Sequence, residues 1–172
     1  MDGTFPDHQS VLRDILASHG IPADSVFIEK VHQERVGAKA VPFYDIIPEV
    51  LKVLQIVKGK GLKVGLISNC APEEVLSWNN CELATYFDAV IFSCDVKQAK
   101  PNRKIYEIAC EKLEVTPQEA IFIGDGGANE LVGAIEAGIQ AFHATWFLPK
   151  YKSEQIKDFY KLETPMDVLK VL

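Results

Sequence analysis

The sequence has neither a long apolar run nor a surplus of positive charge, and each lack excludes a class of protein. No uninterrupted apolar stretch approaches the roughly 18 residues that a transmembrane helix needs, so we expect no membrane partner. Because 24 acidic side chains outnumber 18 basic ones and the net charge is −6, the chain has no electrostatic footprint for nucleic acid. The acidic, polar start MDGTFPDHQS is unlike a secretory signal, and we expect a cytoplasmic protein.

Cysteine is also scarce. The four cysteines form no CxxC pair, and no histidine stands at zinc spacing, which argues against a structural zinc site. Reduced, buried thiols are therefore the expected state. The length of 172 residues, with 48% hydrophobic and 24% charged side chains, is typical of one globular domain and excludes a disordered chain.

From residue 43 onward, short apolar runs alternate with amphipathic segments. Strands are predicted at 62–68, 89–93, 120–124 and 139–145. Helices are predicted at 48–59, from Pro72, from Pro101 to about Leu113, near 129–137 and over the closing PMDVLKVL. Alternation of this kind, with continuously apolar strands, predicts an α/β fold in which helices cover both faces of a parallel sheet.

Polar residues follow three of the predicted strands. Ser68 and Asn69 end the first one, and Lys100 precedes the helix after the second. Asp125 follows the third, with Glu130 five residues later. Because ligands of open α/β sheets gather beyond the carboxyl ends of the strands, we expect these side chains to converge. A hydroxyl, an ammonium and carboxylates suit a phosphate dianion beside a magnesium ion.

Each feature also has a purely structural explanation. Ser68 and Asn69 favour chain turns, and GDGGANEL could be a tight glycine turn whose Glu130 complements a helix dipole. Lys100 could be a surface residue before a proline. However, lysine is a poor helix N-cap and its charge opposes the helix dipole, which favours an external anion as its partner.

Together the three segments resemble motifs of the haloacid dehalogenase (HAD) superfamily, most of whose members are phosphatases that act through an aspartyl-phosphate. LISN at 66–69 resembles the second motif, KPNRKIYEIACEKL from Lys100 the third, and IFIGDGGANEL at 121–131 the fourth. The resemblance covers roughly residues 43–148. It implies a three-layer Rossmann-like sandwich with a mostly parallel sheet, whose core would comprise residues 43–172, and a small N-terminal helical cap.

The resemblance also assigns roles. Ser68, Asn69 and Lys100 would hold the phosphoryl group, with Ser68 and Lys100 taking part in catalysis, and Asp125 would bind Mg²⁺. The family often has a second acid four or five positions later. Asn129 and Glu130 occupy those positions, and Glu130 is the better candidate because it is a carboxylate.

The first motif of the family is a strand ending in D-x-D-G-T, whose first Asp attacks phosphorus and whose second acts as acid and base. Asp2-Gly3-Thr4 resembles its second half, which implies that Asp2 is the acid/base and a metal-site residue. The nucleophile would then lie one residue before Met1, and the first central strand of the sheet would be missing. We expect a shortened form of a longer protein, with residues 1–42 holding the remnant of this motif and a reduced cap.

The resulting hypothesis is a Mg²⁺-dependent phosphatase of a small phosphorylated metabolite, monomeric or homodimeric, whose chain as given is inactive. A non-catalytic relative that binds a phosphorylated ligand or a protein partner is the alternative, because the attacking Asp is absent. A 2-haloacid dehalogenase would use the same Asp without a metal. The acidic residues Asp2, Asp125 and Glu130 favour magnesium instead.

Overall fold

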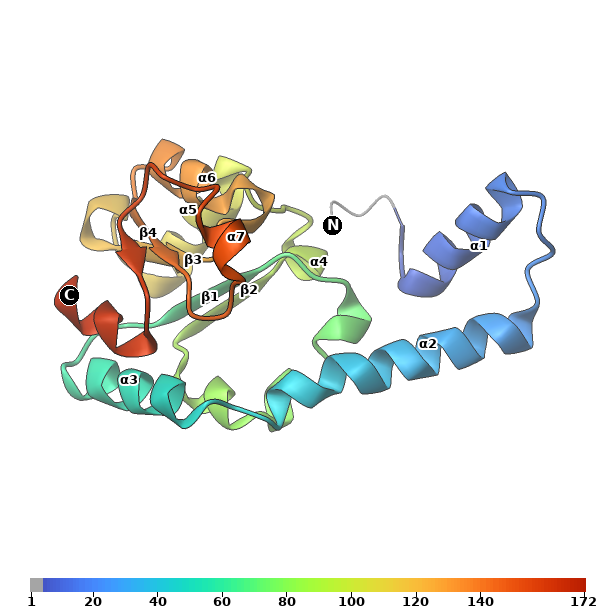
Figure 1. Cartoon of the computed structure of the whole chain (residues 1–172), viewed down its shortest axis with the longest axis horizontal. Coiled ribbons are helices and arrows are strands. Elements are labelled where there is room, and N and C mark those ends of the chain that lie inside the picture. Colours follow the sequence, from blue (N-terminus) through green and yellow to red (C-terminus); the bar gives the residue numbers. More distant parts are fainter. Residues whose placement is uncertain (1–4) are drawn as a thin grey trace.

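The computed structural model describes residues 5–172, in which helices and parallel strands alternate after an N-terminal pair of helices (Figure 1). The helices are α1 (His8–Ser18), α2 (Ser25–Ala40), α3 (Pro48–Gly59), α4 (Ser93–Val96), α5 (Arg103–Leu113), α6 (Glu130–Glu136) and α7 (Lys150–Ser153). The strands are β1 (Gly65–Ser68), β2 (Ala89–Phe92), β3 (Ile121–Gly124), β4 (Gln140–Ala144) and β5 (Lys161–Leu162). Each of the four apolar runs predicted as strands contains one. Within this part of the chain, no helix has the length and apolar character to cross a membrane.

The strands form two parallel sheets instead of one. β1 pairs with β2, in register from Gly65 opposite Ala89 to Ser68 opposite Phe92. β3 pairs with β4, and β4 with the short β5. Among the described residues, no strand pairing joins β1 to β3. The predicted parallel α/β architecture is therefore confirmed, with its sheet divided between β1 and β3.

Helices cover both faces of the sheets, which gives the core three layers. On one face, α5 and α6 bury a cluster of apolar side chains with β2 and β4 that includes Ile91, Ile105, Tyr106, Leu131 and Ala141. On the other face, α3 and a C-terminal 3₁₀ helix (Pro165–Lys170) pack on β4 and β5 through Val53, Val57, Phe142, Leu162 and Val168. These two clusters fix the positions of the strands, and the site residues follow the ends of β1 and β3.

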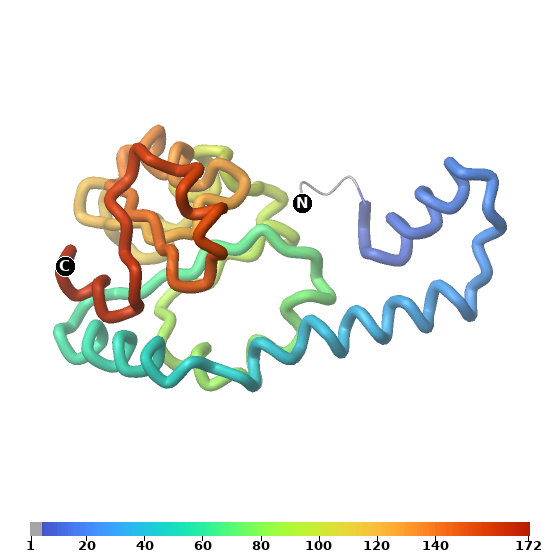
Figure 2. The backbone as a smooth tube through the Cα atoms, in the orientation of Figure 1, coloured from blue at the N-terminus to red at the C-terminus, as the bar shows by residue number. Residues whose placement is uncertain are grey.

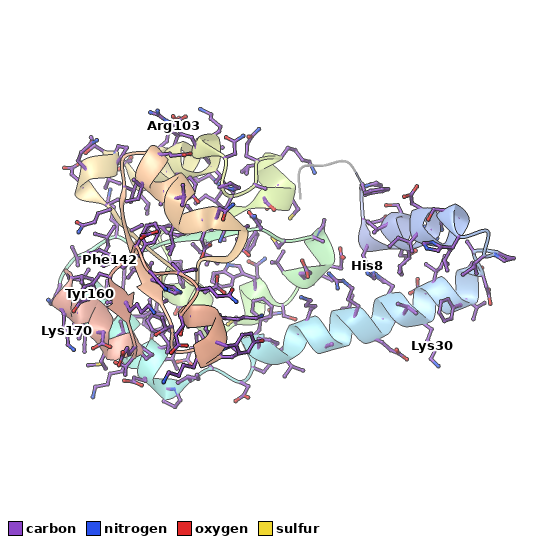
Figure 3. The ribbon with its side chains drawn as sticks, turned by 45° about the horizontal axis from the view of Figure 1, so that its top comes forward. His8, Lys30, Arg103, Phe142, Tyr160 and Lys170 are labelled. Carbon is purple, nitrogen blue, oxygen red and sulfur yellow. The ribbon has the colours of Figure 1, made fainter. Side chains whose placement is uncertain are left out.

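Helices α1 and α2 form an arm (residues 8–40) that extends away from the sheets (Figure 2). α1 has no buried residue, and α2 buries only Ile28. The arm meets the core through ion pairs: Arg35 contacts the carboxylates of Glu73 at 3.5 Å and Glu74 at 2.7 Å, and Lys39 contacts Glu74 at 2.8 Å. In Figure 3, His8 and Lys30 are labelled on the arm, far from Phe142 and Tyr160 in the core.

Two segments differ from the sequence prediction. The helix expected from Pro72 is a series of 3₁₀ turns at Pro72–Glu74, Trp78–Asn80 and Glu82–Tyr86. These turns surround the buried Trp78, whose ring packs edge-on against Phe43, Phe87 and Phe92, so tertiary contacts override the helical signal. The closing helix is likewise of the 3₁₀ type.

Candidate active site

One lysine side chain connects the end of β1 with the residues that follow β3. The Nζ atom of Lys100 donates to the main-chain oxygen of Ile67 in β1 at 3.2 Å and to the Glu130 carboxylate at the start of α6. It also lies 5.9 Å from the centroid of the Phe122 ring in β3. The side chains of Lys100 and Glu130 are 13% and 5% exposed. An ammonium that is shielded from water and paired with Glu130 therefore connects the end of β1 with the start of α6.

The Glu130 carboxylate is held on both oxygens. Besides the contact with Lys100, its Oε1 accepts the Gly126 N–H at 3.1 Å. Its main-chain oxygen accepts the Tyr106 hydroxyl at 2.7 Å. Burial, and then the charge of Glu130, raises the pKa of Tyr106, so this hydroxyl remains a donor. Glu130 also lies directly over Gly124, where a Cβ would come within 2.2 Å of Oε1. Only glycine at position 124 permits that approach.

Asn69 fixes the main chain of Lys100. Its Nδ2 donates to the Lys100 carbonyl oxygen at 2.9 Å, and the Lys100 N–H donates to its Oδ1 at 2.8 Å. The sequence assigned Asn69 to the phosphoryl group itself. In the structure the Asn69 amide oxygen and one amide N–H contact the main chain of Lys100, and the contact with a phosphoryl group stays a prediction.

Asp125 directly follows β3 and is the exposed carboxylate of this turn. Its Oδ1 accepts the Gly127 N–H at 2.8 Å. The turn is left-handed at Gly126, and also at Ala128 (φ 52°) and Asn129 (φ 53°). Non-glycine residues rarely adopt this conformation, and such strain gathers at functional sites. Asn129 itself is exposed and makes no capping hydrogen bond.

The donor set at this turn fits a hard cation. Asp125 keeps Oδ2 free of any hydrogen bond to the described residues, whereas both carboxylate oxygens of Glu130 are engaged. Mg²⁺ commonly takes one or two protein carboxylates and completes its shell with water and substrate phosphate, so Asp125 meets the minimum requirement. Within residues 5–172, no three His, Cys, Asp or Glu side chains form a metal-binding group. Asp2 lies outside the described residues.

Ser68 ends β1 half-buried, and its hydroxyl makes no hydrogen bond to the described residues. The loop after it is tied to the end of β2, because the Cys70 N–H donates to Ser93 Oγ at 3.0 Å. The Cys70 and Cys94 sulfurs lie 3.8 Å apart. Burial, and then Cys70, raises the pKa of Cys94 to about 12, so that thiol stays protonated and is no nucleophile at neutral pH.

The structure thus brings Asn69, Lys100 and Glu130 into one bonded group. Ser68 adjoins it through Asn69, and Asp125 through the Gly126 turn. Sequence reasoning missed Tyr106, whose hydroxyl anchors Glu130, because nothing in the α5 pattern separates it from an ordinary core aromatic. His143 lies fully buried in β4 opposite Gly124, and burial lowers its pKa.

Comparison with known proteins agrees with this geometry. The sequence model of the haloacid dehalogenase-like hydrolases matches residues 5–138, which is most of the chain. The chain belongs to this family.

Two curated relatives carry phosphatase names. One is the pyrophosphatase PpaX of Bacillus mycoides, 29% identical over 72% of this chain. The other is a phosphorylated carbohydrates phosphatase of Thermotoga maritima, 31% identical over 68%. The chain spans 58% and 54% of their respective lengths.

Solved structures show the same fold. A Thermotoga maritima protein provisionally described as a β-phosphoglucomutase is 26% identical, with a TM-score of 0.68 over 95% of this chain and 76% of its own. A HAD phosphatase from Thermococcus onnurineus has a TM-score of 0.66 at 20% identity, over 95% of this chain and 86% of its own. The second likeness concerns the fold alone.

Proposed function

We propose that this chain carries the phosphate- and magnesium-binding part of a phosphatase that acts on a small phosphorylated metabolite. The observation that carries the proposal is the shielded Lys100 ammonium, held between the β1 end and Glu130 beside the Asp125 turn. The phosphatase names of the relatives in Bacillus mycoides and Thermotoga maritima support the same reaction class.

The side chains divide the work of binding a phosphoryl group. An ammonium has three N–H donors, and Lys100 uses two of them on Ile67 and Glu130, which leaves the third for a phosphoryl oxygen. The Ser68 hydroxyl donates to a second oxygen. Asp125 would hold Mg²⁺ with Oδ2, and Mg²⁺ when bound neutralises charge on the phosphoryl oxygens. Glu130, which the sequence offered as a metal residue, would reach the metal only by giving up its contact with Lys100 or Gly126.

The assignment of the attacking group rests on the family resemblance. It places an aspartate immediately before Met1, and Asp2 as the acid/base two residues after that aspartate. We propose that the chain as given binds phosphate without turning it over, and that a carboxylate at the preceding position restores an aspartyl-phosphate route. Binding does not need the attacking atom, because it depends on positioning and charge.

Calorimetry of phosphate binding, with and without Mg²⁺, tests the metal and phosphate roles. Mg²⁺ should tighten binding of inorganic phosphate by about tenfold, the effect of one added charge-assisted contact. Asp125→Asn should lose this gain. Asp14→Asn on the exposed side of α1 is the matched control and should keep it. Equal phosphate affinity with and without Mg²⁺ would refute the assignment of Asp125.

Hydrolysis of an aryl phosphate tests the nucleophile. The 172-residue chain should be inactive, and a form extended by a strand ending in Asp directly before Met1 should be active. Strong Mg²⁺-dependent turnover by the unextended chain would overturn the assignment. Phosphate binding without turnover in either form would instead favour the non-catalytic alternative. Halide release from a 2-haloacid that survives chelation would favour a dehalogenase.

A further inference from the structure

A cleft of about 360 Å³ opens beside Asp125, on the side of the turn that faces α7. The Asp125–Gly127 turn lines one side, and residues 148–156, in and around α7, line the other. The volume is at the lower end of the range for small-molecule sites. Because Asp125 lines the cleft, a ligand in it would adjoin the carboxylate to which we assign the metal.

Two residues from opposite sides of the cleft, Gly126 and Ile156, pack against each other. Gly126 adopts φ 86°, and a Cβ at that position would lie 2.1 Å from Cδ1 of Ile156. The segment that follows α7 therefore packs on the backbone of the turn itself. The cleft is accordingly a fixed neighbour of the Asp125 turn.

Lys152 gives the cleft a positive charge that the chain leaves unbalanced. No carboxylate of residues 5–172 lies within ion-pair distance of its ammonium, whereas Lys150 on the same helix contacts Glu154 at 3.8 Å. In a chain of net charge −6, an unpaired lysine in a concave surface is a favourable place for an anionic group.

The other polar side chains of the cleft support the same ligand chemistry. The Tyr151 hydroxyl and the Gln155 side chain both line it, and neither makes a side-chain hydrogen bond within the described chain. Both can donate to an anionic oxygen, as Lys152 can. Leu148 and Ile156 add apolar surface for a short carbon segment. Asp125 is the one acidic residue of the lining, and a bound Mg²⁺ would offset its charge.

We propose that this cleft receives the part of the substrate beyond the phosphoryl group, and that this part bears a second anionic group held by Lys152 with Tyr151 and Gln155. The proposal rests on the proposed function, since it takes the phosphoryl group to lie between Lys100 and Asp125. It narrows the substrate class to phosphate esters whose leaving alcohol bears a carboxylate or a second phosphate, and to phosphate anhydrides whose leaving group is a second phosphate.

The test uses phosphonates, which cannot be hydrolysed, on the 172-residue chain with Mg²⁺. 3-Phosphonopropionate carries a carboxylate beyond its phosphonate, methylenediphosphonate carries a second phosphonate, and propylphosphonate carries neither. By calorimetry, at least one doubly anionic probe should bind about tenfold more tightly than propylphosphonate, the value of one charge-assisted contact. The probe whose affinity increases shows whether the second anionic group is a carboxylate or a phosphate.

Two lysine variants decide the assignment. Lys152→Gln should abolish the preference for the doubly anionic probe, while Lys150→Gln, which removes the same charge from the same helix, should preserve it. Both lysines are exposed, so the fold should survive, and equal melting temperatures would confirm this. If all three phosphonates bind equally, or both variants behave alike, the cleft proposal is overturned while the proposed function stands. If no phosphonate binds, the phosphate site itself is refuted, and this extension with it.

Discussion

The arm and the core of this molecule are held together by different forces. The core buries side chains such as Ile105 and Tyr106 completely, in clusters on both faces of the sheets. The arm leaves apolar residues exposed, including Ile15 at 49% and Val26 at 75%, and it meets the core through Arg35 and Lys39. Apolar burial therefore determines the stability of the core, while a few charges determine where the arm lies.

The position of the arm is also linked to the site. Arg35 and Lys39 bind Glu73 and Glu74, which lie four to six residues after Ser68 and Asn69 in the same connection. The Glu74 carboxylate in turn accepts the Ala71 N–H at 2.9 Å. A movement of α2 would therefore pull on the loop that positions Lys100 through Asn69.

The largest expected difference is between a core and an arm isoleucine. Ile105→Ala removes a fully buried side chain and should lower the free energy of unfolding by about 2–5 kcal/mol. Ile15→Ala on the half-exposed face of α1 should cost less than about 0.5 kcal/mol. Urea denaturation followed by circular dichroism measures both. Equal losses would show that the arm is part of the same cooperative core.

A smaller effect is expected at the contact between the two regions. Arg35→Gln leaves the buried Glu73 carboxylate without its cation and should lower the free energy of unfolding by about 1–3 kcal/mol. We expect the lower end of this range, because Arg35 is a quarter exposed and solvent screens the ion pair. In this variant, the rate of protease cleavage between α1 and α2 should also rise, because α2 is held less firmly against the core. The double variant Arg35→Gln/Glu73→Gln should recover part of the loss.

The control for that contact is Lys30→Gln. Lys30 pairs with Glu34 at 4.0 Å on the exposed face of α2, with side chains 74% and 69% exposed, so its removal should change neither stability nor cleavage. If Lys30→Gln loosens the arm as much as Arg35→Gln does, general charge and not the Arg35 contact holds α2.

The smallest effect concerns pH. Burial, and then the charge of Arg35, lowers the pKa of His8, so the folded arm favours the neutral imidazole. As pH falls below about 6.5, the unfolded chain takes up this proton first, and the contribution of His8 to stability is lost with acidification. Melting temperatures between pH 8 and 5 should fall less steeply in His8→Phe. Some slope should remain, because burial also lowers the pKa of His143 in the core.

Sequence patterns located the elements of the core because its strands are continuously apolar. They did not find β5, since Lys161–Leu162 contains no apolar run and forms a strand only by pairing with β4. They also placed a helix after Pro72, where contacts around Trp78 favour short turns. A local sequence pattern contains no information about contacts with residues that are distant in the chain.

The same reason explains which parts of the candidate site the sequence predicted and which it did not. The residue types of Ser68, Lys100 and Asp125 indicated a phosphate and metal site from the order of their loops. The amide contact of Asn69 with Lys100 joins residues 31 positions apart, and the Lys100–Glu130 pair joins residues 30 apart. Such pairings depend on how the sheets and α6 pack, so the sequence could name the side chains but not their partners.

The contact between Asn69 and Lys100 has a chemical consequence for the ageing of the protein. A primary amide is matched to a peptide group because it offers one donor and one acceptor side by side. Spontaneous deamidation of Asn69 to aspartate would keep the shape but turn the donor into a second acceptor, facing the Lys100 carbonyl. Stored samples that acquire this one-dalton change should lose affinity for phosphate while retaining their fold.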